Sequence, residues 1–104
     1  MTIDLTSPRA LLLQEAQALV CGDRNNQYGE PGQDFTRTAE LWTVLLAEKL
    51  APGQYISPAD VALLMCALKL SRLTWAPEKR DSWVDLAGYA ACGWDVASTG
   101  EVES

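Results

Sequence analysis

Two cationic side chains stand three positions apart in the most apolar stretch of the sequence, and they are the first candidates for chemistry. Lys69 and Arg72 lie near the end of residues 58–75, a segment that carries a long unbroken run of apolar side chains. Residues three apart share a face of an α-helix, and a lysine beside an arginine suits recognition of a phosphate group. The structural alternative is that both side chains reach water from the end of a buried helix or pair with Asp85.

The polar segment GDRNNQYGEPGQD, residues 22–34, supplies a second set of candidates. Its asparagines and glycines accept positive φ angles, which predicts a loop of defined shape. In such a loop, backbone N–H groups and an arginine can bind phosphate, and an aromatic ring can serve as a platform. The candidate ligand-binding residues are therefore Arg24, Asn25, Tyr28 and Gly29 in the loop, Lys69 and Arg72 on the apolar segment, and Tyr89 further on. The structural alternative makes Arg24 and Asn25 ordinary loop residues and Tyr28 part of the core.

Carboxylates form the third set. If the protein is an enzyme, the pool of Mg²⁺ ligands is Glu40, Asp60, Asp81 and Asp85. Asp81 and Asp85 fall on one stripe of a predicted helix, which is typical of a solvated face. Gly88 and Cys92 on the same stripe are small enough to let another backbone or a ligand approach closely. The sequence contains no histidine, so His-based triads and His-ligated metals are excluded.

Four helices must position these residues. Apolar periodicity and capping signals predict helices over residues 8–21, 35–50, 58–75 and 82–97, and no strands. Ser57 and Pro58 mark the start of the third helix, and Asp34 is the predicted cap of the second. The predicted fold class is all-α, an antiparallel helical bundle. We expect residues 1–7 to be a flexible N-terminus, 8–97 a single helical domain and 98–104 a disordered tail.

The helix predicted over residues 58–75 is apolar around most of its circumference. Three partner helices cannot cover all of it, and Leu41 and Val44 lie on a second face of the helix before it. A second subunit is the natural cover for such surfaces. The sequence therefore predicts a homo-oligomer.

Composition limits the classes of partner. The formal net charge is −6, from 8 basic and 14 acidic residues, which argues against an extended nucleic-acid surface but allows a local cationic pocket. No apolar run is long enough to span a membrane, and the N-terminus lacks the features of a signal peptide, so we expect a cytoplasmic protein. Cys21, Cys66 and Cys92 are widely spaced among apolar neighbours, which predicts buried free thiols.

The order of these features resembles a group of small phage and prophage proteins of unknown function. The residues that carry the resemblance are Arg24-x-x-x-Tyr28-Gly29, Phe35-x-x-x-Ala39-Glu40-Leu41-Trp42, Asp60-Val61 with Lys69-x-x-Arg72, and Asp85-Leu86-Ala87-Gly88-Tyr89. These proteins look distantly similar to the all-helical MazG-like nucleoside triphosphate pyrophosphohydrolases, and the similarity spans about residues 10 to 97. The resemblance implies a helical, nucleotide-associated fold and, for a phage-encoded protein, the host cell cytoplasm as its location.

MazG-like enzymes bind magnesium through a Glu-Glu-x-x-Glu motif and a later Glu-x-x-Asp motif. This chain has Glu40 without the companion acids, and Ser82-x-x-Asp85 in place of the second motif. Three hypotheses stay open. The first, which fits the missing acids better, is a phage-type protein that holds a nucleotide or a cyclic nucleotide signal of host defence in a cationic pocket, an anti-defence role that needs no metal. The second is a Mg²⁺-dependent nucleotide pyrophosphohydrolase, and the third is a structural or protein-interaction bundle.

Overall fold

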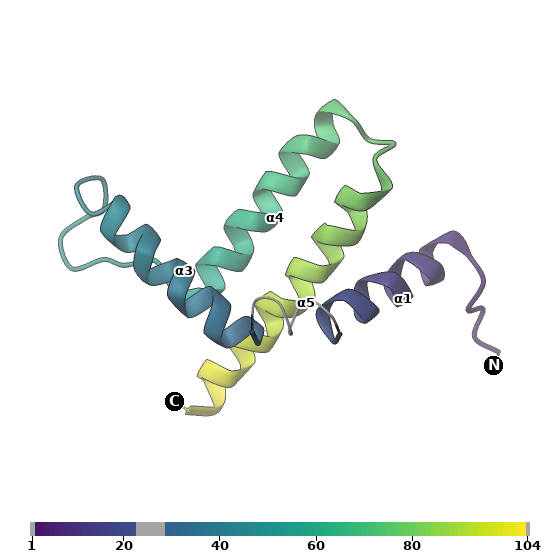
Figure 1. Ribbon diagram of the computed structural model, residues 1–104, viewed down its shortest axis with the longest axis horizontal. Coiled ribbons are helices and arrows are strands. Elements are labelled where there is room, and N and C mark those ends of the chain that lie inside the picture. The colour runs from purple at the N-terminus through teal and green to yellow at the C-terminus, as the bar shows by residue number, and fades with distance from the viewer. Residues whose placement is uncertain (1, 23–28, 104) are drawn as a thin grey trace.

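The computed structural model describes residues 2–22 and 29–103, with side chains up to residue 98. Within these residues the chain forms helices and no strands, as the sequence predicts (Figure 1). The helices are α1 (Pro8–Val20), α3 (Pro31–Leu45), α4 (Pro58–Trp75) and α5 (Arg80–Glu103). No helix in the described ranges is long and apolar enough to cross a membrane.

Helix α4 has the bounds that its capping residues predict. The Ser57 hydroxyl accepts a hydrogen bond from the backbone N–H of Asp60 at 3.0 Å, and the Asp60 carboxylate accepts one from the backbone N–H of Ser57 at 3.0 Å. This reciprocal capping box satisfies two backbone donors that a helix end otherwise leaves unpaired. Pro58 occupies the first turn, where its missing N–H costs nothing.

Helix α3 begins and ends earlier than predicted. It starts at Pro31 with Glu30 as its cap, and the prediction that Asp34 caps this helix is wrong because Asp34 lies in the first turn. Pro31 sets the start, since its fixed φ is already helical. The helix ends at Leu45, and residues 46–50 form turns instead of the predicted last turns of helix.

A tertiary hydrogen bond accompanies this early end. The Thr43 hydroxyl donates to the carbonyl oxygen of Ala39 at 2.8 Å and accepts from the backbone N–H of Ile56 at 2.8 Å. The chain must therefore reverse direction between these two residues. Gly53 lies in this reversal and has a φ of 81°, a left-handed conformation that glycine adopts readily. Such a contact between distant residues cannot be read from helical periodicity.

Helix α5 is longer than the predicted range of 82–97. Its first residue is Arg80, directly after the turn at Pro77, and its backbone stays helical to Glu103. Near its start, Arg80 forms an ion pair with Glu15 of α1. This pair ties α5 to α1, a helix that begins at Pro8 as predicted and ends at Val20.

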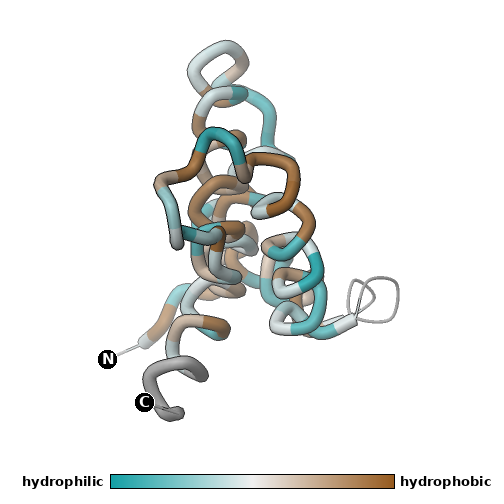
Figure 2. The backbone as a smooth tube through the Cα atoms, turned by 90° about the vertical axis from the view of Figure 1, so that its left-hand side faces the viewer, coloured by the Kyte–Doolittle hydropathy of each residue, from teal (hydrophilic) through white to brown (hydrophobic). Residues whose placement is uncertain are grey.

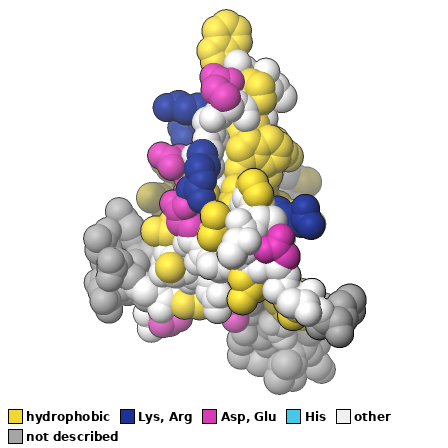
Figure 3. Space-filling model, turned by 90° about the vertical axis from the view of Figure 1, so that its right-hand side faces the viewer, with side chains coloured by type: hydrophobic (Ala, Val, Ile, Leu, Met, Phe, Trp, Pro, Cys, Tyr) yellow, Lys and Arg dark blue, Asp and Glu magenta, His cyan; other side chains and the backbone are white. Residues whose placement is uncertain are grey.

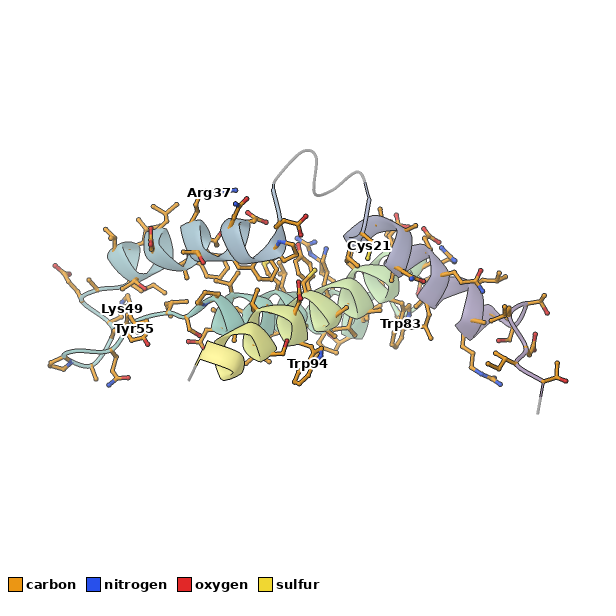
Figure 4. All side chains as sticks on the ribbon, turned by 90° about the horizontal axis from the view of Figure 1, so that it is seen from below. Cys21, Arg37, Lys49, Tyr55, Trp83 and Trp94 are labelled. Carbon is orange, nitrogen blue, oxygen red and sulfur yellow. The ribbon has the colours of Figure 1, made fainter. Side chains whose placement is uncertain are left out.

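The antiparallel α4–α5 hairpin is the centre of the molecule (Figure 1). Among the described residues, α1 packs on α5 alone, and α3 packs on α4 and, less extensively, on α5. Phe35 and Ala39 of α3, Val61 and Ala62 of α4, and Cys92 of α5 form the buried core. Figure 4 shows that α3 and the C-terminal end of α1 lie on one side of the hairpin.

The chain is open for its size. Its radius of gyration is 15.6 Å, whereas about 13 Å is typical of a compact chain of this length. Its accessible surface is 7658 Å², against ~5,700 Å² for a monomer of this mass. Hydrophobic stretches reach the outer edge of the molecule (Figure 2), and Leu41 and Val44 are exposed, as the sequence predicts.

The three cysteines are free thiols that differ in exposure. Cys92 is buried in the core and Cys66 is half-buried on α4, but Cys21 is exposed. The prediction of a buried Cys21 is wrong because this residue caps the end of α1, a helix that packs on only one neighbour among the described residues.

Candidate functional site

Lys69 and Asp85 form an ion pair between α4 and α5. The Lys69 Nζ lies 3.0 Å from Oδ2 of Asp85, and the two side chains are 11% and 37% exposed. The lysine is therefore held by its carboxylate partner at the end of an almost buried stem, while the carboxylate keeps part of its surface in water. The pairing fulfils the structural alternative considered for Lys69.

Arg72 lies one helical turn beyond Lys69. Its side chain is exposed, and it makes no ion pair with any residue that the structure describes. Arg72 thus has its full set of guanidinium donors available to a ligand or to solvent. The two cations that the sequence groups together differ in role, because only Lys69 is paired with Asp85.

The segment from Asp85 to Tyr89 is held by both flanking helices. Gly88 faces α1 so closely that a Cβ built on it would stand 3.2 Å from the Val20 side chain. Tyr89 stacks on Phe35 of α3, with ring centroids 6.3 Å apart and an interplanar angle of 28°. The small residue predicted to admit a backbone or a ligand therefore admits α1, and Tyr89 packs against the core.

The loop candidates are only partly within the described residues. Arg24, Asn25 and Tyr28 lie outside them. Gly29 has a φ of 85°, which confirms that the loop uses a glycine in the left-handed region. An added Cβ on Gly29 would lie 3.2 Å from the Gln33 side chain, so any larger residue there would be both strained and crowded.

The four predicted magnesium ligands do not come together. Asp60 belongs to the capping box, Asp85 pairs with Lys69, and Glu40 and Asp81 are exposed on different helices. Within the described ranges, no group of three or more acidic or cysteine side chains is placed to share a metal ion. Glu40 and Asp81 therefore keep the solvated role that exposed acids usually have.

An apolar groove between α4 and α5 was not foreseen from the sequence. Its volume is about 340 Å³, and it is lined by Ala59, Ala62, Leu63, Cys66, Tyr89, Ala90, Gly93, Trp94 and Ala97. Gly93 makes it narrow, since a Cβ there would lie 2.9 Å from the Cβ of Ala62. Small residues recur three to four positions apart on both α4 and α5. This pattern is the sequence signal that could have predicted a close approach of the two helices. Burial raises the pKa of the Cys66 thiol in this groove.

Comparison with known proteins places the chain in a family. The family described as "Domain of unknown function (DUF6378)" matches residues 11–97. The chain belongs to this family. "Gene 55 protein" of Mycobacterium phage D29 is 41% identical over 81 residues, 78% of this chain and 50% of that protein. "Gene 55 protein" of Mycobacterium phage L5 is 33% identical over 79 residues, 76% of this chain and 47% of that protein.

The chain thus spans about half the length of these curated relatives. The similarity to a small phage-type domain of unknown function is therefore confirmed. The names of the relatives state no ligand and no reaction, and the similarity to MazG-like enzymes stays a prediction. No solved structure matches the chain.

Proposed function

We propose that this domain of the family binds a phosphorylated small molecule, a nucleotide or a cyclic nucleotide signal, beside Lys69 and Arg72. The observation that carries the proposal is the contrast between these two cations. Lys69 is fixed by Asp85 on an almost buried stem, and Arg72, one turn away, is exposed without an ion pair to any described residue. A fixed ammonium and an available guanidinium are complementary to the oxygens of one phosphate group.

Asp85 fits the same ligand in a different way. Its carboxylate is 37% exposed, so one oxygen can accept a hydrogen bond from a ribose hydroxyl while the other holds Lys69. The net charge of −6 disfavours a long polyanion but not a small ligand bound by two local cations. Within the described part of the chain no three acidic side chains are placed to share a metal ion, and we therefore propose binding without a metal in preference to hydrolysis.

Thermal shift with a panel of nucleoside mono-, di- and triphosphates and cyclic dinucleotides tests the proposal. At least one member should raise the melting temperature, because a ligand that binds the folded state alone stabilises it. Arg72→Ala should weaken binding of that member by roughly 1.5 to 3 kcal/mol, the range for a lost charge-assisted hydrogen bond. Lys49→Ala removes an exposed cation from the turn after α3 and is the matched control.

Incubation with the nucleotide that stabilises the protein distinguishes binding from hydrolysis. With Mg²⁺ present, a binding protein returns the nucleotide unaltered, whereas a pyrophosphohydrolase releases pyrophosphate. Magnesium-dependent turnover that is lost in Asp85→Asn would replace the binding proposal with the enzymatic one. A panel without any stabilising member would reject both.

A further inference from the structure

In the described part of the chain, the face of the α4–α5 hairpin that carries the apolar groove exposes large apolar side chains. We call it the hairpin face, and define it by the groove-lining residues together with Leu70 of α4 and Trp83 of α5. Leu63, Trp83 and Trp94 are 67%, 45% and 66% exposed. Trp83 and Trp94 project on the side of the hairpin away from α3 (Figure 4). Such large exposed rings are uncommon on a monomer unless they meet a partner.

The hairpin face carries no charge. Every side chain that lines the groove is uncharged, and neither Lys69 nor Asp85 is among them. Figure 3 shows hydrophobic side chains gathered in a band beside the charged ones. The chemistry of this surface therefore suits an apolar partner.

We propose that a second copy of this chain covers the hairpin face. Two helices form a single layer, and a layer with an apolar face is stable when a second layer packs on it. In a two-fold dimer the hairpins of two copies stack and create a four-helix core from two α4 and two α5 helices. Helices α1 and α3 then stay on the outside of the dimer.

The groove and the tryptophan beside it are self-complementary. Trp94 is a large exposed ring, and Ala59, Gly93 and Ala97 leave a hollow next to it. In the proposed dimer each Trp94 packs over the hollow of the other copy, and the two-fold axis makes the two contacts equivalent. Each chain carries a net charge of −6, so two copies repel each other except across an uncharged surface.

The surface area is sufficient for this assembly. The chain exposes 7658 Å², which is about 1,900 Å² more than a monomer of its mass typically exposes. A standard stable interface buries about 800 Å² per partner. The excess surface of the whole chain is therefore larger than the area that one copy buries in a standard interface, and burying the hairpin face in a dimer brings the exposed surface closer to the usual value.

Light scattering after size exclusion tests the dimer. The wild-type chain should have twice the 11.3 kDa mass of one copy at micromolar concentration. Trp94→Glu places a charge in the interface and should give a monomer. Trp75→Glu is the matched control, because Trp75 is also exposed, at 91%, but does not line the groove. Circular dichroism should show unchanged helix content in both variants.

A milder variant and a chemical probe support the same test. Leu63→Ala should raise the dimer dissociation constant by about tenfold or more, since central interface residues carry most of the affinity. Cys66 in the groove should react with iodoacetamide faster in Trp94→Glu than in the wild type, with the exposed Cys21 as internal reference.

A wild-type monomer at all concentrations, or a dimer that persists in Trp94→Glu, would overturn the proposal. A larger assembly that falls apart into smaller units only in Trp94→Glu would support it.

Discussion

The Lys69 Nζ lies 3.0 Å from Oδ2 of Asp85, yet the two partners differ in their access to water. The lysine side chain is 11% exposed and the aspartate side chain 37%. A charge that loses its partner costs more free energy when less water can reach it. Removing the aspartate should therefore lower the free energy of unfolding more than removing the lysine does.

Asp85→Ala should destabilise the fold more than Lys69→Met. The first change leaves an almost buried ammonium unpaired, for which we expect a loss of about 2 kcal/mol in the free energy of unfolding. The second leaves a half-exposed carboxylate that water can solvate, and should cost less than about 1 kcal/mol. Urea denaturation at one protein concentration measures both, and equal or reversed losses would contradict this account of the pair.

The bounds of α4 could be predicted from sequence because their causes are local. Ser57 and Asp60 cap the helix within one turn, and Pro58 is compatible with the first turn only. The end of α3 could not be predicted in this way. It coincides with a hydrogen bond from the backbone of Ile56 to Thr43, and only the folded chain brings these two residues together.

The ion pair at the candidate site could not be predicted from the sequence. Lys69 and Arg72 were both candidates for Asp85, and the spacing of three residues does not decide which one faces α5. The rotation of α4 about its axis decides it, through packing of residues such as Val61 and Leu73. The groove was missed for a related reason, because it arises where Ala62 and Gly93 of two helices meet.

Gly93→Ala should separate α4 from α5. The new Cβ would lie 2.9 Å from the Cβ of Ala62, and overpacking of this kind typically costs about 1 to 3 kcal/mol. Gly32→Ala is the control, since nothing lies within 4 Å of its added Cβ. The control should be neutral or stabilising by up to about 1 kcal/mol, because alanine favours the helix. Adding Ala62→Gly to Gly93→Ala should restore part of the lost free energy of unfolding. If it does not, the contact with Ala62 is not the cause of the destabilisation.

The Cys66 thiol should ionise at higher pH in the folded protein than in the unfolded chain. Burial raises its pKa above the ordinary value of 9.0. Because the folded state then holds the proton more tightly, this thiol favours folding below pH 9.0, and the contribution is lost as the pH rises through the folded pKa. Alkylation rates of Cys66 in a Cys21→Ser background, followed by mass spectrometry with and without urea, should show the higher midpoint in the folded state. Identical midpoints would count against burial of this thiol.

The last prediction separates packing from ligand binding at Tyr89. Its ring stacks on Phe35 and packs against the core, while its hydroxyl makes no hydrogen bond to a residue within the described ranges. Tyr89→Ala should therefore cost about 3 kcal/mol, as expected when a packed aromatic ring is lost. Tyr89→Phe keeps the ring and should leave the free energy of unfolding within about 0.5 kcal/mol of the wild type. If the hydroxyl also contacts the phosphorylated ligand, Tyr89→Phe should weaken nucleotide binding without changing stability. Unchanged binding in Tyr89→Phe would assign Tyr89 to the core alone and leave Lys69 and Arg72 as the described side chains that we propose contact the phosphate.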